Sequence, residues 1–227
     1  MRQIDVGGQS FMSIREKDKC YVDKSMLISD IINTNSDGVF LFTRPRRFGK
    51  SLNLSMLDAF FNLNYKGNTW FDGLEISDHH EFDSYRNAFP VIILDMKAVM
   101  ASSHDTFLKG MRSALAQTFD DFRYLLKGDM EPDEQLMFQS ILERNLDSVL
   151  LQESLSFLCK LLERFHGVKP IVLIDEYDSP INRAFGKDTY EGIIEFMRGL
   201  YSSTLKGNKN LQFAVVTGVM QIAKESI

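Results

Sequence analysis

The sequence predicts a three-layer α/β fold with a mainly parallel central sheet. Four short apolar runs have the length and composition of buried strands, and most are separated by stretches with helical periodicity. The runs are apolar on both faces, which is typical of parallel strands covered by helices on each side. The chain has 227 residues, of which 44% are hydrophobic, so one large domain with a sizeable core is expected over residues 1–227.

The expected strands are apolar runs bounded by turn-forming or charged residues. They are Val39–Phe42, Val91–Lys97, Ile171–Ile174 and Leu211–Thr217. Pro90 and Pro170 directly precede the second and third runs, and Gly218 ends the fourth.

Helical periodicity fills most of the connections. Helices are expected over residues 26–32, 52–61, 103–126, 133–145, 148–165 and 189–205. Asp23 is the expected N-cap of the first, within an N-terminal segment over residues 1–35, and residues 65–80 are expected to be mostly loop. A new helix is expected to begin at Gln221. Its abrupt end at Ile227 suggests the N-terminal part of a longer protein.

Composition narrows the functional classes. A net charge of −5 argues against a surface that coats nucleic acid, so direct nucleic-acid binding is not expected. No apolar run approaches the ~20 residues that cross a bilayer, and the N-terminus lacks a signal-peptide core. The two cysteines, Cys20 and Cys159, have no metal-binding spacing. A cytoplasmic protein without a membrane partner is therefore expected.

A basic loop follows the first strand. It reads RPRRFGKS over Arg44–Ser51, and the phosphate-binding pattern G-x-x-x-x-G-K-[ST] is matched except at its first position, where Arg44 stands. Gly49 lets the backbone approach phosphates, and Lys50 is expected to reach the β- and γ-phosphates. Backbone N–H groups at a helix start favour an anion, and the Ser51 hydroxyl is expected to bind Mg²⁺.

Two acids follow the third strand. Asp175 and Glu176 should emerge at the carboxyl edge of the sheet, because buried charges without partners are costly. That edge also carries the basic loop. Asp175 is expected to hold Mg²⁺, directly or through water, and Glu176 to polarise the attacking water as general base.

Three further polar residues lie at the same edge. Thr217 ends the fourth strand and is interpreted either as a polar sensor of the γ-phosphate or as a plain strand terminus. Asp95 ends the second strand, where a capping role is favoured over one in orienting water or substrate. Asp178 is read as a helix cap in preference to an acid assisting Glu176.

The combination predicts a P-loop nucleotide-binding site. Lys50 and Glu176 are the expected catalytic residues, and Ser51 and Asp175 the expected metal ligands. The expected nucleotide-binding residues are Arg46, Arg47, Phe48, Gly49, Lys50, Ser51, Leu52 and Thr217. For Arg46 and Arg47, contact with a neighbouring subunit is an open alternative.

At these residues the chain resembles the predicted AAA-ATPase-like family of bacteria and archaea. The matching strings are QSFMSIREKDKCYVDKSMLI, RPRRFGKSL, IVLIDEYDSPI and VVTGVMQIAKESI, and they run over nearly the whole chain. The family writes its phosphate loop as RPRRFGKSL, so Arg44 is expected there. Many members carry a C-terminal nuclease-like domain, which this chain does not reach.

The resemblance implies that the chain binds ATP and Mg²⁺. Slow hydrolysis is the expected activity, because Gln221 stands where an arginine is frequent in the family. The alternative is a non-hydrolysing, nucleotide-gated switch that controls a downstream domain. A nucleic-acid-processing accessory that uses the basic loop is a third reading, against which the net charge argues. ATP or ADP, a homo-oligomer and a downstream domain are the expected partners.

Overall fold

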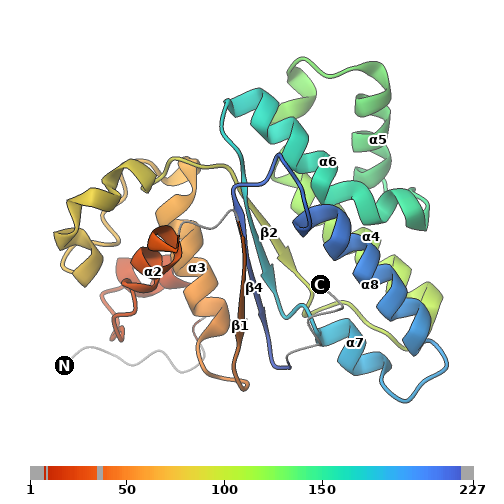
Figure 1. The fold of residues 1–227 in the computed structure, drawn as a ribbon, viewed down its shortest axis with the longest axis horizontal. Helices are drawn as coiled ribbons and strands as arrows, with labels where there is room; N and C mark the ends of the chain where they lie inside the picture. Colours follow the sequence, from red (N-terminus) through yellow and green to blue (C-terminus); the bar gives the residue numbers. More distant parts are fainter. Residues whose placement is uncertain (1–7, 9, 35–37, 221–227) are drawn as a thin grey trace.

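A four-stranded parallel sheet forms the middle layer of the molecule (Figure 1). The computed structural model describes residues 8, 10–34 and 38–220. The strands are β1 (Val39–Thr43), β2 (Val91–Asp95), β3 (Ile171–Asp175) and β4 (Phe213–Gly218). Their order across the sheet is β1-β4-β3-β2, so the last strand in the chain lies between the first and the third. The predicted three-layer α/β fold is confirmed.

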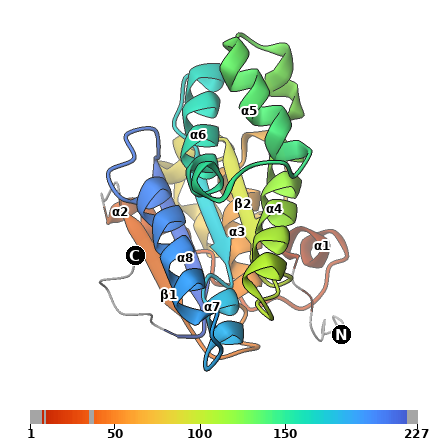
Figure 2. The ribbon, with the colours of Figure 1, turned by 90° about the vertical axis from the view of Figure 1, so that its right-hand side faces the viewer.

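Helices cover both faces of the sheet, as Figures 1 and 2 show. One face carries α1 (Phe11–Glu16), α2 (Leu27–Asn33) and α3 (Lys50–Phe61). The other lies under α4 (His104–Asp120), α6 (Ser148–His166), α7 (Ser179–Ala184) and α8 (Tyr190–Leu205), and α5 (Pro132–Leu142) packs against α4 on the outside. The 3₁₀ helices are η1 (Leu63–Tyr65), η2 (Glu75–Asp78), η3 (His80–Tyr85) and η4 (Arg123–Lys127).

Strand alternation divides the core into two clusters. Ile171 and Leu173 of β3 pack into the cluster beneath α3, whereas Val172 and Ile174 pack beneath α4, α6 and α8. Because alternate residues of a strand share a face, Asp175 continues the Ile171–Leu173 row and points toward α3. The apolar pattern of β3 thus decides on which side of the sheet its terminal acid emerges.

The structure corrects several expected elements. The helix expected over residues 103–126 ends at Asp120, where the chain turns so that Phe122 and Leu125 reach the core. Asp23 is not the N-cap of α2, because α2 starts at Leu27 and Asp23 Oδ1 accepts a hydrogen bond from Ser25 N instead. Helices α1 and α7 were not expected, since each has only six residues. The expected helix from Gln221, and the Gln221 position itself, lie outside the described residues.

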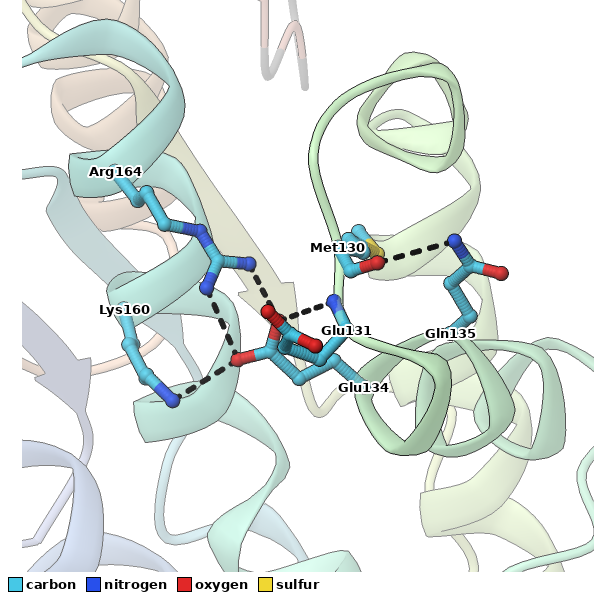
Figure 3. Close-up of polar contacts among 6 residues, drawn as sticks. All are labelled: Met130, Glu131, Glu134, Gln135, Lys160 and Arg164. Atoms are coloured by element: carbon cyan, nitrogen blue, oxygen red, sulfur yellow. Dashed lines mark hydrogen bonds and ion pairs between the residues drawn. The ribbon is translucent and has the colours of Figure 1, made fainter.

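An ion-pair cluster attaches α5 to α6 (Figure 3). Glu134 of α5 is buried and accepts hydrogen bonds from Lys160 Nζ at 2.9 Å and Arg164 Nη2 at 2.5 Å. It also accepts one from the backbone N–H of Glu131, which closes a capping box at the start of α5. These contacts lower the pKa of Glu134 from 4.5 to about 2, chiefly through Arg164.

No helix among the described residues is long and apolar enough to cross a membrane.

Candidate functional site

The carboxyl ends of the parallel strands bring the basic loop and the acidic pair together. The loop over residues 44–49 leaves β1 and enters α3, while Asp175 and Thr217 lie at the ends of β3 and β4. Because β4 separates β1 from β3, Thr217 lies between the loop and the acids. This edge of an open parallel sheet is where ligands bind.

The loop begins as an extension of β1. Arg44 N donates to Gly218 O at 3.1 Å, which prolongs the pairing of β1 with β4 by one residue. The backbone of Arg44 does not have a positive φ, so glycine is not required at this position. This explains how an arginine stands at the first glycine position of the phosphate-binding pattern.

The centre of the loop is left-handed at two positions. Arg47 has φ 67° and Gly49 has φ 77°, and Gly49 is the N-cap of α3. Left-handed residues alternating with others turn successive N–H groups toward one side and form an anion-binding concavity. For Arg47 this conformation is unfavourable, and such strain concentrates at functional sites.

Lys50 points back into this loop. Its ammonium donates to Arg44 O at 2.9 Å and to Pro45 O at 3.2 Å, and the residue is only 9% exposed. The other basic side chains of the loop, Arg44, Arg46 and Arg47, are exposed, as is Phe48. Lys50 is therefore the buried cation of the loop.

The Asp175 carboxylate accepts side-chain hydrogen bonds from two other elements of the site. Its Oδ2 accepts a hydrogen bond from Ser51 Oγ at 2.5 Å, and its Oδ1 accepts one from Thr217 Oγ1 at 2.5 Å. Ser51 is 124 residues away in the chain. Thr217 and Asp175 are both buried. The structure thus brings together the first residues of α3 and the ends of β3 and β4.

Glu176 follows Asp175 at a strained turn. Its φ is 53°, and its side chain is half-buried. The next residue, Tyr177, donates its N–H to Thr217 O at 3.0 Å, so the turn is tied to the end of β4. A non-glycine residue in the left-handed region is costly, and the neighbouring bonds hold Glu176 there.

The remaining predicted positions divide between the site and its surroundings. Leu52 is half-buried in the first turn of α3. Asp95 is exposed and accepts a hydrogen bond from Lys97 N at 2.7 Å, which closes the turn after β2. It caps no helix, because the next helix, α4, has Ser103 as its N-cap. Its Cα is in register with that of Asp175 on the neighbouring strand.

Asp178 has a role that the sequence did not indicate. It makes no side-chain cap to α7, so the capping interpretation is wrong. Its Oδ2 accepts hydrogen bonds from the N–H groups of Val219 at 3.1 Å and Met220 at 2.8 Å. Tyr177 Oη donates to Met220 O at 2.7 Å. Together, Tyr177 and Asp178 clamp the chain that leaves β4.

The donor set at the loop fits Mg²⁺. Ser51 and Asp175 supply one hydroxyl and one carboxylate, whose oxygens already lie side by side. Among the described residues no group of three or more His, Cys, Asp or Glu side chains forms a metal cage. Mg²⁺ in nucleotide sites uses one or two protein oxygens together with phosphates and water, so a cage is not required.

The fold and this edge define the class of P-loop nucleotide-binding domains. A glycine–lysine–serine loop opens a helix after one strand, and an aspartate ends another strand beside the serine. A sequence model described as predicted AAA-ATPase matches residues 5–227, and the chain belongs to this family.

One curated relative is a protein of Azotobacter chroococcum mcd 1 named "Uncharacterized protein in vnfD 5'region". It is 27% identical over 232 residues, which cover 100% of this chain and 39% of the relative. The chain therefore spans well under half of that relative's length. No solved structure matches the chain.

Proposed function

We propose that this domain binds ATP with Mg²⁺ and hydrolyses it slowly. The observation that supports this best is the convergence on Asp175. The Ser51 and Thr217 hydroxyls both donate to its carboxylate. Ser51 directly follows Lys50, whose buried ammonium lies in the loop. Family membership supports nucleotide binding by the same residues.

The phosphate loop is prepared for an anion. Lys50 now donates to the carbonyls of Arg44 and Pro45, and in the proposed complex it exchanges these for the β- and γ-phosphate oxygens. The N–H groups of Phe48 to Ser51 lie at the positive end of α3 and donate to the phosphates. Arg46 and Arg47 add positive charge from the exposed rim.

The acids complete the proposed chemistry. Ser51 and Asp175 would hold Mg²⁺, which would supply positive charge against the phosphates. Thr217 donates its hydroxyl to Asp175 and so orients that carboxylate, which supports a role for Thr217 as the polar sensor in this proposal. Glu176 accepts a proton from the attacking water as general base. The strained backbone at Glu176 supports this role, because it sets the direction of the carboxylate independently of β3.

Calorimetric titration of MgATP with two variants tests the assignment. Lys50→Ala should lose most of the ATP affinity, whereas Lys66→Ala, an exposed lysine beyond the far end of α3, should bind as the parent does. Glu176→Gln should keep binding and lose turnover in a phosphate-release assay. Equal ATP affinity in Lys50→Ala and the parent would remove the basis of the proposal.

A nucleotide-gated switch is the second candidate. The clamp of Tyr177 and Asp178 on Val219 and Met220 favours it, because this clamp joins the acidic turn to the chain beyond β4. A switch would show ATP-dependent protection of that chain from proteolysis without phosphate release. Turnover that Glu176→Gln abolishes would favour the hydrolase. The expected cytoplasmic location and the expected homo-oligomer or downstream-domain partner stay predictions.

A further inference from the structure

Lys24 lies beside the phosphate loop although it precedes β1 in the chain. Its backbone carbonyl accepts a hydrogen bond from Leu27 N at 3.1 Å, and the residues before it are anchored by their side chains. Asp23 Oδ2 accepts a hydrogen bond from Glu75 N at 2.8 Å, and Tyr21 Oη donates to Met56 Sδ of α3 at 3.1 Å. The Lys24 side chain itself is exposed. These contacts therefore hold the backbone at Lys24 in place, while its ammonium group stays accessible to solvent.

The ammonium of Lys24 reaches the start of α3. Its Nζ is 3.8 Å from the place that a Cβ on Gly49 would occupy. Gly49 is the left-handed N-cap of α3, one residue before Lys50. Two lysine side chains thus lie against the backbone of the loop over residues 44–49. Lys50 reaches it from the start of α3, and Lys24 reaches it from the segment before α2.

This is an electrostatically unfavourable place for a cation. The N-terminus of a helix carries partial positive charge, which favours anions and repels ammonium groups. The loop carries further basic side chains, namely Arg44, Arg46, Arg47 and Lys50. The ion pairs found within the described part of the chain lie elsewhere, and none includes Lys24. A bound polyanion would turn these repulsions into attractions.

We infer that Lys24 is a second phosphate-contacting lysine of the nucleotide site. This inference rests on the proposed function. Lys50 contacts the phosphates from within the loop, and Lys24 contacts them from the side of Gly49. An additional cation on the phosphate chain favours nucleoside di- and triphosphates over adenosine, because its attraction grows with the ligand's charge.

Calorimetry with MgATP, ADP and adenosine on the 227-residue chain tests this role. Lys24→Gln removes the charge and leaves a polar side chain that is one atom shorter, and Lys24→Arg restores the charge. Lys66→Gln is the matched control, because Lys66 follows the far end of α3, a helix of 12 residues that is ~18 Å long. We expect Lys24→Gln to weaken ATP binding about tenfold with unchanged adenosine binding, and Lys24→Arg to recover most of the loss.

The outcomes separate this inference from the proposed function. If the parent binds MgATP and Lys50→Ala does not, but Lys24→Gln binds as tightly as the parent, Lys24 has no phosphate role. Equal weakening of ATP and adenosine would overturn it as well, because it would indicate a structural effect. A parent that binds no ATP rejects the proposed function, and this inference with it.

A second measurement uses the unaltered chain. Acetic anhydride should acetylate Lys24 more slowly in the presence of MgATP, while the rate at Lys66 stays unchanged, as followed by mass spectrometry. Equal rates at Lys24 with and without MgATP would contradict the contact.

Discussion

Replacing Glu134 by glutamine should destabilise the fold in a pH-dependent way. The Glu134 carboxylate is 8% exposed and is held by Arg164 and Lys160, which lower its pKa from 4.5 to about 2. At about 1.4 kcal/mol per pKa unit, this corresponds to about 3.5 kcal/mol. Arg164 and Lys160 are 40% and 56% exposed, so solvent screening reduces the expected loss to about 1–2 kcal/mol.

The sign of the pH dependence follows from the lowered pKa. The contribution of Glu134 is fully present above pH 4.5, the unfolded value, and is lost as the pH falls toward the folded value of about 2. At about pH 3 more than half of the difference between the parent and Glu134→Gln should have disappeared. Urea unfolding at pH 7, 5, 4 and 3 measures this difference.

The control is Glu153→Gln, which removes an exposed carboxylate from α6. Its free energy of unfolding should stay within about 0.5 kcal/mol of the parent value. Helix α5 lies toward the end of the sheet opposite the phosphate loop (Figure 1), so Glu134→Gln should leave ATP affinity unchanged. A difference from the parent that is constant between pH 7 and pH 3 would refute the ion-pair explanation.

Two further substitutions test packing, one in the second half of α3 and one at the end of β4. Asp58 of α3 is 3% exposed, and burial raises its pKa from 3.8 to about 6. The folded state favours the protonated carboxyl, so the stability that Asp58 contributes is fully present below pH 3.8 and is lost as the pH rises through 6. Asparagine stays neutral at every pH, so Asp58→Asn should be more stable than the parent at pH 7 by about 2 kcal/mol. Urea unfolding at pH 4 and 7 measures this, and a variant less stable at pH 7 would contradict it. Gly218→Ala would place a Cβ 2.7 Å from Asp178 Oδ1 and still closer to the Tyr177 ring. It should cost about 1–3 kcal/mol and weaken ATP binding, and parental stability would exclude the clamp.

The four strands and most helices were predictable because their signals are local. A strand buried on both faces must be apolar at every position, as Ile171–Ile174 is. The glycine–lysine–serine string between a strand and a helix also carries its own geometry, since N–H groups at a helix start bind anions wherever the helix lies. The short helices α1 and α7 escaped prediction because six residues give too little periodicity.

At Arg44, the first residue of the loop, the sequence pattern expects a glycine that the backbone conformation does not require. The pattern expects glycine at position 44, but the backbone there extends β1 and does not adopt positive φ. Two residues of the loop are left-handed, Gly49 and Arg47, and at Arg47 the sequence gives no local sign of a positive φ.

Local sequence patterns were enough to predict the class of fold and the chemical groups of the candidate site: a lysine and a serine after one strand, and an aspartate and a glutamate after another. The strand that lies between them could be known from the folded molecule alone. With β4 inserted between β1 and β3, Thr217 and Ser51 meet on the Asp175 carboxylate. Strand order, the approach of Lys24 to Gly49 and the clamp by Asp178 all join segments far apart in the chain, and no local pattern of residues encodes such distant pairings.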